Sequence, residues 1–249
     1  SEPDSGSDLA SVRTRAVQVD GGWKVTGTKV WTSGAQYSEA FFCLARTEPV
    51  DTSNRHAGLS QFLLDLRSEG VTIRPIESMS GSRHFSEVIL DEVFVPDEMV
   101  FGEIGAGWKQ VNSELAFERS GPERFLSSFR LFAEAVRPSS GGEPVLDPAT
   151  AGRWAARLAA LHGLSRSVAE TLQSGGQADV PASLVKVLGT TTEGDIVDVV
   201  DAAVGDELTH DPEILALLRA GVVQRPGFTL RGGTNEILRG VIARGLELR

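Results

Sequence analysis

The sequence is poor in the residues that most often build metal centres and covalent cross-links. Cys43 is the only cysteine among 249 residues. A single cysteine excludes an internal disulfide and a cysteine-built metal site, and it suits a reducing compartment. The histidines lie far apart and lack the spacing of metal ligands; they are His56, His84, His162 and His210. We therefore predict no metal site and a cytoplasmic location.

Three further absences concern partners and completeness. No apolar run reaches the length of a transmembrane helix, and no signal peptide opens the chain. With 34 acidic against 24 basic residues and a net charge of -10, the chain has no Lys/Arg cluster typical of nucleic-acid binding. We expect neither a membrane span nor a nucleic-acid partner. Because the chain begins at Ser1 without an initiator methionine, we interpret it as a fragment or a processed form.

Short strand patterns fill the first part of the sequence. The Asp20-Gly21 pair, which lies between two β-rich runs, supplies the positive φ values of a tight hairpin turn. Loop residues separate the further strands that we expect, which are Phe41–Ala45, Gln61–Asp65, Val71–Pro75 and Val88–Val95. Residues 1–103 are therefore predicted to form an antiparallel sheet domain, barrel-like in character.

Helical patterns fill residues 104–249. Asp147-Pro148 combines an N-cap side chain with a proline at the first helical position, and an apolar face follows as far as Leu172. Further helices are expected over Pro181–Ala203, as a short segment after Asp211-Pro212, and over Thr234–Leu248. Long helices with apolar faces and short connections predict an antiparallel helical bundle. The predicted fold class is thus α+β, a sheet domain followed by a bundle.

One charged residue interrupts the longest apolar stripe. Over Gly107–Val136, apolar residues recur in steps of three and four around Glu118, which predicts one buried helical face. A carboxylate in that row would lose hydration, so its pKa should rise and Glu118 becomes a candidate general base. The alternative is that Glu118 is paired with a basic side chain or reaches solvent, with Pro122 kinking the helix.

Four motifs in the same order resemble the acyl-CoA dehydrogenase family. They are Ser1–Asp8, Lys29–Ser33, Asp91–Pro96 with Gly102 and Gly107-Trp108 beyond it, and Gly232–Ile237 followed by Ile242-Ala243-Arg244. The resemblance covers most of the chain. It implies an N-terminal helical domain, absent here, then a middle sheet domain and a C-terminal four-helix bundle. It also implies FAD as cofactor, an acyl-CoA substrate oxidised to a trans-2-enoyl-CoA, and an electron-transfer flavoprotein as electron acceptor.

The resemblance further assigns residues to the cofactor and the substrate. Trp31 would pack on the isoalloxazine and Ser33 would lie near flavin N5. The full set of implied cofactor residues is Ser1, Ser7, Trp31, Thr32, Ser33, Thr234, Asn235 and Glu236. Ser7 and Gly233 would also contact the substrate. Structural alternatives are a sheet-core role for Trp31 and an N-cap role for Thr234. The turn-rich segment Ser1–Asp8 has its own alternatives, an anion-binding loop or a solvated coil.

The family places its catalytic glutamate at either of two positions. At one of them this chain has Gly232, which cannot accept a proton and would leave room for the acyl chain. At the other it has Glu118-Arg119. The resemblance therefore implies that Glu118 removes the α-proton while the β-carbon delivers hydride to flavin N5, with Arg119 beside the substrate.

Two segments depart from the family pattern. Arg137–Gly142 lacks the usual Arg-x-x-Phe-Gly segment, and Val204–His210 lacks Gln-x-Phe-Gly-Gly. In the family, the first of these helps bind the FAD of a neighbouring subunit. We therefore expect a homologous partner subunit, as in heteromeric dehydrogenases, some of which act on steroid-CoA thioesters; a homo-oligomer is the other arrangement. The alternative function is a non-catalytic structural subunit.

Overall fold

The computed structural model describes residues 1–138, 143–205 and 211–248. It divides into two compact units, Ser1–Ser113 and Glu114–Arg249, which we call the sheet unit and the helical unit. The domain boundary expected between residues 103 and 104 stays a prediction. Parts of the two segments that depart from the family pattern, residues 139–142 and 206–210, lie outside the described residues.

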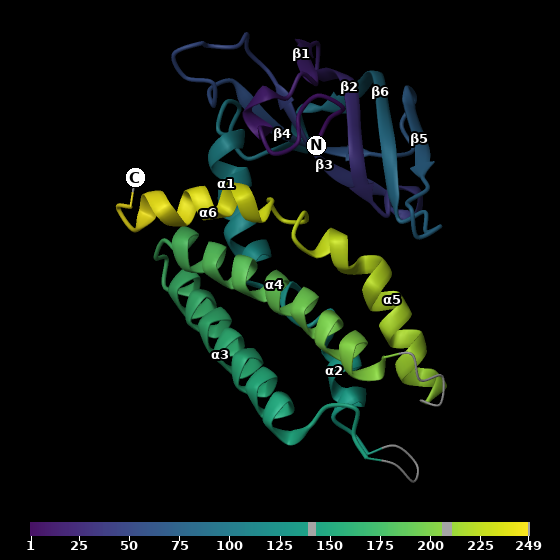
Figure 1. Cartoon of the computed structure of the whole chain (residues 1–249). Coiled ribbons are helices and arrows are strands. Elements are labelled where there is room, and N and C mark those ends of the chain that lie inside the picture. Colours follow the sequence, from purple (N-terminus) through teal and green to yellow (C-terminus); the bar gives the residue numbers. More distant parts are fainter. Residues whose placement is uncertain (139–142, 206–210, 249) are drawn as a thin grey trace. The chain divides into compact units, whose positions relative to one another are not determined.

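The sheet unit is built around one seven-stranded sheet with the order β5-β6-β2-β1-β3-β4-β7 (Figure 1). The strands are β1 (Arg15–Val19), β2 (Gly22–Ser33), β3 (Ala40–Arg46), β4 (Leu59–Asp65), β5 (Val71–Ile76), β6 (Phe85–Pro96) and β7 (Val100–Phe101). Short 3-10 helices join them at Leu9–Ser11, Ala35–Tyr37 and Asp97–Met99. Neighbouring strands pair antiparallel except β1 and β3, which are parallel where Arg15 faces Arg46.

The expected barrel-like character is wrong, because in the described residues the sheet stays open with β5 and β7 at its edges. The expectation of an antiparallel sheet also needs correction, since the β1–β3 pair makes the sheet mixed. Closing a barrel requires the two edge strands to pair with each other. β7 has only two residues. Alternating patterns in the sequence report local strands, but they carry little information on closure.

The predicted strands and the hairpin are confirmed. Val19 pairs with Gly22 across the Asp20-Gly21 turn, where Gly21 has a φ of 73°. The other expected strands lie within β3, β4, β5 and β6. Apolar residues of these strands form one buried core, in which the Trp23 and Phe62 rings lie 5.6 Å apart.

The helical unit is organised around one long central helix, α4 (Asp179–Val204). Helix α1 (Gly107–Ser120) begins within the sheet unit and ends in the helical unit, and the other described helices are α2 (Phe129–Ala135), α3 (Pro148–Gln173), α5 (Pro212–Phe228) and α6 (Asn235–Gly245). Helices α2, α3, α5 and α6 pack against α4, and Figure 1 shows α3 beside it. Because α4 has neighbours on several sides, it buries polar as well as apolar residues, including Lys186 and Glu193. None of the described helices combines the length and apolar character needed to cross a bilayer.

The helix starts follow the predicted caps. The Asp147 side chain accepts hydrogen bonds from the backbone N–H groups of Ala149 and Thr150, at 2.9 and 3.0 Å. Asp211 likewise accepts from the N–H of Glu213 at 2.9 Å. The helix after Asp211 is 17 residues long, so the expected short segment is corrected. A cap marks where a helix begins, whereas its length depends on the packing that follows.

The single helix expected over Gly107–Val136 is also corrected. Helix α1 ends at Ser120, a 3-10 turn occupies Pro122–Arg124, and α2 begins at Phe129. Pro122 has no N–H to donate and disfavours a helical conformation at the preceding residue. Gly121 is accordingly extended, with φ -65° and ψ 155°. The apolar spacing continues across this break, but the helix does not.

Candidate active site

Glu118 lies near the end of α1 with its side chain 46% exposed. The prediction that it is buried within an apolar row is therefore wrong. The buried residues near the end of α1 are Ala116, Arg119 and Ser120, which lie on the other side of the helix. The alternative is confirmed, because Glu118 reaches solvent and is paired with a basic side chain.

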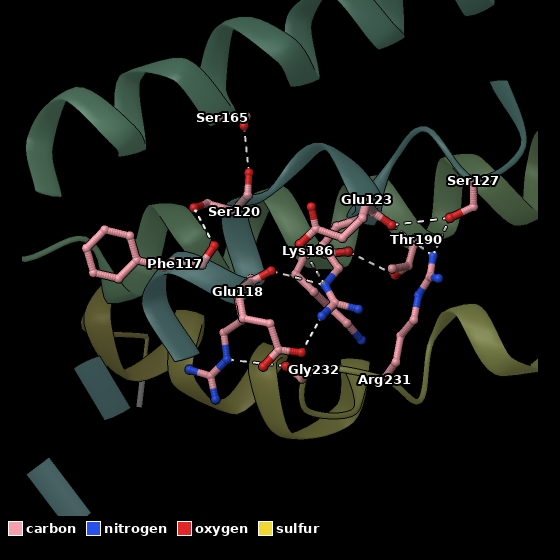
Figure 2. A network of polar contacts seen from close by, with 12 residues as sticks. Phe117, Glu118, Ser120, Glu123, Ser127, Ser165, Lys186, Thr190, Arg231 and Gly232 are labelled. Carbon is pink, nitrogen blue, oxygen red and sulfur yellow. Dashed lines mark hydrogen bonds and ion pairs between the residues drawn. The ribbon is translucent and has the colours of Figure 1, made fainter. Parts of the chain in front are cut away.

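The basic partner of Glu118 is Arg124, in the 3-10 turn that follows α1. Figure 2 shows Glu118 in this region, close to Gly232. The Arg124 side chain is only 7% exposed. Its Nη2 donates to the Glu118 carboxylate, and its Nε donates to the Glu118 backbone carbonyl at 3.1 Å. A buried guanidinium thus holds an accessible carboxylate by two separate contacts.

The loop before α6 lies beside this pair. Gly232 and Gly233 both have positive φ values, 66° and 88°. A Cβ added to Gly232 would lie 3.1 to 3.4 Å from three guanidinium atoms of Arg124, so a side chain here would make the guanidinium shift and would also strain the positive φ. The Gly232 carbonyl accepts from Arg119 Nε at 3.3 Å. Burial lowers the pKa of Arg119.

Behind the loop, Lys186 of α4 is fully buried. Its ammonium donates to the carbonyl of Thr229 and to Asn235 Oδ1, both at 2.8 Å. Thr190 also donates to Asn235 Oδ1, at 3.2 Å. Burial lowers the pKa of Lys186, and the nearby Arg124 and Arg231 lower it further, to about 8. These contacts tie the segment that carries the glycines to the central helix.

A second ion pair, with a fully buried carboxylate, lies in the same region. Glu193 of α4 is fully buried and accepts from Arg231 Nη2 and from the backbone N–H of Ser127, both at 2.7 Å. Arg231 also donates to the Ser127 hydroxyl at 2.7 Å (Figure 2). Lys186 therefore holds both ends of the loop before α6 on α4, at Thr229 and Asn235, and Arg231 attaches the middle of the loop to Glu193 of the same helix.

In the sheet unit, Trp31 has an unusual backbone. It lies in β2 with a φ of 62°, at a register shift between Lys29 and Thr32 in the pairing with β6. A bulge of this kind redirects a side chain, and a non-glycine residue in this conformation is strained. The Trp31 side chain is 56% exposed and meets Phe85 edge to face, with ring centroids 5.8 Å apart. Its exposure argues against a sheet-core role.

The other predicted flavin residues of the sheet unit are less constrained. Ser7 and Ser33 are exposed, and Thr32 is half-buried. Ser1 is held by its carbonyl, which accepts from the backbone N–H of Val30 at 2.9 Å. The segment beginning at Ser1 is thus attached to β2 next to Trp31, which brings this part of the predicted set together within one unit.

Glu2 provides the firmest attachment of that segment. Its buried carboxylate accepts from Lys29 Nζ at 2.8 Å and from the backbone N–H groups of Arg13 and Thr14, at 2.6 and 3.0 Å. Burial would raise the pKa of Glu2, but the Lys29 ammonium and these hydrogen bonds lower it to about 2. Lys29 also donates to the Leu44 carbonyl at 2.6 Å. The solvated-coil alternative does not fit a segment held in this way.

In the helical unit, the structure brings Glu118, Arg119, Gly232 and Gly233 together. Thr234 caps α6, accepting from the N–H of Ile237 at 3.4 Å. Asn235 is buried against Lys186, and Glu236 is exposed in the first turn of α6.

Sequence reasoning missed Arg124, Lys186 and Arg231. A basic residue six positions after Glu118 was a usable signal once the chain was expected to turn at Pro122. Lys186 stands among apolar residues of α4, and a buried lysine needs oxygen partners. Nothing local in the sequence identifies those partners. Among the described residues, no three His, Cys, Asp or Glu side chains are grouped so as to hold a metal ion.

Comparison with known proteins gives one family. The profile described as "Acyl-CoA dehydrogenase, middle domain" matches residues 1–93. Acyl-CoA dehydrogenase FadE34 of Mycobacterium tuberculosis is 36% identical over 252 residues, a match that covers 99% of this chain and 34% of FadE34. The chain thus spans about a third of that relative.

Two solved structures of similar sequence share the fold. The ChsE4-ChsE5 complex from Mycobacterium tuberculosis matches with a TM-score of 0.80 at 27% identity, over 100% of this chain and 68% of that one. The Tcur3481-Tcur3483 steroid ACAD matches with a TM-score of 0.78 at 28% identity, over 100% and 66%. With the sheet unit, the helical unit and the four motifs in order, these matches establish that the chain belongs to the acyl-CoA dehydrogenase family.

Proposed function

We propose that the chain takes part in the FAD-dependent α,β-dehydrogenation of an acyl-CoA thioester, with Glu118 as the base. The observation that carries the proposal is an accessible carboxylate held beside a loop of two glycines. Glu118 can meet a substrate atom there, whereas the neighbouring Gly232 offers no side chain that could accept a proton. Family membership supports the reaction class.

The residues of the sheet unit fit a flat aromatic cofactor. Trp31 presents an exposed ring from a strained bulge, and such strain is typical of residues that serve a ligand. We propose that Trp31 stacks on the flavin, with Thr32 and Ser33 near its ring and Ser1 and Ser7 on the adjoining segment. In the helical unit, Thr234, Asn235 and Glu236 complete the proposed set. FAD would supply the acceptor for the hydride, which carries both electrons of the oxidation.

The residues of the chain perform the proton step. The Glu118 carboxylate removes the proton from the carbon α to the thioester carbonyl, while the β-carbon loses a hydride and the trans double bond forms between the two carbons. Ser7, Arg119 and Gly233 are proposed to contact the thioester. Arg119 is buried at 9% exposure and held by the Gly232 carbonyl, so its orientation is fixed before the substrate arrives.

Replacement of Glu118 tests the proposal. In the flavin-loaded protein, Glu118→Gln should slow flavin bleaching by acyl-CoA about 10²- to 10⁴-fold, the usual contribution of a general base. Glu114→Gln is the matched control, because Glu114 is exposed one turn earlier on the same helix. Stopped-flow absorbance at equal flavin content measures both. Equal rates in Glu118→Gln and the control would remove Glu118 from the mechanism.

The second candidate function is a non-catalytic structural subunit. The Glu118–Arg124 ion pair favours it, because a paired carboxylate also serves to stabilise the chain reversal after α1. In that case Glu118→Gln would lower the midpoint of thermal unfolding and leave flavin bleaching unchanged. The stopped-flow experiment therefore separates the two functions.

We further propose a homologous partner subunit, a bulky acyl group such as a steroid side chain, and an electron-transfer flavoprotein as acceptor. The similarity to the ChsE4-ChsE5 complex and to a steroid ACAD supports the first two. Co-expression with a homologue, native mass spectrometry and flavin content per complex test the partner. A homo-oligomer with one FAD per chain would contradict it.

A further inference from the structure

Arg124 and Glu118 form an ion pair whose two ends differ in accessibility. The guanidinium side chain is 7% exposed and the carboxylate side chain 46%. In an ordinary surface pair both ends reach solvent, as in Arg130–Glu213, where the exposed fractions are 71% and 51%. A buried guanidinium can therefore fix the position of the exposed carboxylate and leave the solvent-facing side of that carboxylate free for a ligand.

The position of Arg124 is fixed by close packing of its backbone. Its N–H donates to the Gly121 carbonyl at 3.0 Å. On α4, a Cβ added to Gly189 would lie 2.5 Å from the Arg124 carbonyl oxygen and 3.0 Å from Phe125 Cβ. Phe125 itself is fully buried. The 3-10 turn therefore lies directly on α4, and Arg124 has little freedom to move.

Gly232 lies against the Arg124 guanidinium. A Cβ added to this glycine would meet Cζ, Nη2 and Nε of Arg124 at 3.1, 3.2 and 3.4 Å. Any side chain at position 232 would press on Arg124. The glycine thus has a second role besides its positive φ, which is to admit the guanidinium.

Several other charged groups surround Arg124. From its own turn, Glu123 lies 3.9 Å from Arg124 Nε. From α4, Lys186 is close enough for Arg124 to lower its pKa, and Arg119 of α1 neighbours Gly232. Arg124 thus lies among both acidic and basic groups, and Glu118 is the carboxylate to which its Nη2 donates.

We propose that Arg124 is the positioning residue of the Glu118 base and that Gly232 and Arg124 act as a matched pair. Arg124 fixes the carboxylate next to the Gly232-Gly233 loop by its contacts with the Glu118 carboxylate and the Glu118 backbone carbonyl. This inference rests on the proposed function, because it assumes that Glu118 takes the proton. Arg124 itself touches no reacting atom in this scheme.

The pH profile of flavin bleaching tests the proposal. Arg124→Met should slow bleaching at pH 7 by about tenfold to a hundredfold through misplacement. It should also move the acid limb to higher pH, because the neighbouring positive charge is lost. Arg124→Lys should keep the limb in place and lose rate, since a single nitrogen cannot occupy the positions of both Nε and Nη2. Arg130→Met is the control for removing an exposed arginine.

A glycine pair covers the case in which Arg124→Met does not fold. Gly232→Ala should displace the guanidinium and move the limb in the same direction. Gly175→Ala is matched for positive φ, but its added Cβ would meet nothing within 4 Å, so the limb should stay. The proposal is overturned if the acid limb of the pH profile stays in place in both Arg124→Met and Gly232→Ala. If only Gly232→Ala folds, the position of the acid limb in that variant decides whether the proposal stands.

A spectroscopic titration separates this inference from the proposed function. With ¹³C-labelled glutamate, the Glu118 carboxyl signal is identified by its loss in Glu118→Gln. Its midpoint should rise in Arg124→Met and stay in Arg130→Met, whatever the activity. If Glu118→Gln bleaches normally, the proposed function fails, and Arg124 then positions a structural carboxylate. If Glu118→Gln is inactive but neither the midpoint nor the pH limb moves in Arg124→Met, only the inference fails.

Discussion

The sheet unit and the helical unit each bury a lysine, but they satisfy it differently. Lys29 is 6% exposed and meets the buried Glu2 carboxylate at 2.8 Å. Lys186 is fully buried and, among the described residues, meets only the carbonyl of Thr229 and the amide oxygen of Asn235. The first is a matched pair of opposite charges, whereas the second is a cation held by dipoles.

The difference follows from what each lysine holds. Glu2 and Lys29 attach the first residues of the chain to β2, and a neutral pair does this with little residual charge. Lys186 lies in a region that also contains Arg119, Arg124 and Arg231, whose charges lower its pKa, whereas Glu236 raises it. An ammonium held by dipoles alone costs stability in the helical unit, but it ties both ends of the loop before α6 to the central helix. The Glu2–Lys29 pair therefore stabilises the sheet unit, whereas the buried Lys186 of the helical unit positions the loop of the candidate site.

The largest expected effect comes from breaking the matched pair. Lys29→Met leaves the buried Glu2 carboxylate without its counter-ion, which should lower the free energy of unfolding of the sheet unit by about 3–5 kcal/mol. The double variant Glu2→Gln/Lys29→Met should recover much of the loss, since no charge then remains buried. Urea unfolding followed by the fluorescence of the buried Trp23 measures this. A Lys29→Met loss below about 1 kcal/mol would contradict the matched-pair interpretation.

Acid should act on the sheet unit through Glu2. Its pKa is about 2 in the folded chain against 4.5 for a free glutamate, so the folded state binds fewer protons between these values. The stabilisation is therefore present above pH 4.5 and is lost as the pH falls toward 2, by up to about 3 kcal/mol. Urea midpoints from pH 6 to pH 2.5 measure the slope. Glu2→Gln should flatten it, and an unchanged slope would refute the assignment.

Alkali should act on the helical unit in the opposite sense. The pKa of Lys186 is about 8 in the folded chain against 10.5 for a free lysine, so the unfolded state binds more protons between these values. The cost of burying the charge is full below pH 8, and stability should rise toward pH 10.5 by at most about 3 kcal/mol. Unfolding followed by Trp154, which packs against the core of the helical unit, measures it. Lys186→Met should remove the rise, and persistence of the rise would exclude Lys186 as its cause.

The smallest effect is expected at an exposed pair on the same strand as Lys29. Lys24 and Glu92 lie 2.9 Å apart, with exposed fractions of 45% and 63%. Lys24→Met should change the free energy of unfolding by about 0.2–1 kcal/mol, because water screens the pair. The distance nearly equals that of Lys29–Glu2, so the contrast between the two variants isolates burial. Equal losses would mean that burial does not set the strength of these pairs.

Much of the fold followed from local rules. The hairpin at Asp20-Gly21 and the caps at Asp147 and Asp211 were predicted, because each depends on residues within a few positions of one another. The sequence did not predict that the sheet stays open or that the helix breaks at Gly121. Strand and helix periodicities indicate which face of an element is buried, but they do not indicate where the element ends. The longest apolar stripe crossed that break, and this is why Glu118 was expected to be buried.

The candidate site divides in the same way. The sequence by itself determined which residue types stand where: Glu118 beside Arg119, glycines at 232 and 233, and an aromatic residue at Trp31. Only the tertiary structure decided that Arg124 folds back onto Glu118, and that Lys186 reaches Asn235 across 49 positions of the chain. The physical reason is that a buried charged group forms its hydrogen bonds and ion pairs with the groups that the packing brings near it. Local sequence therefore determines the groups, and long-range packing determines their partners.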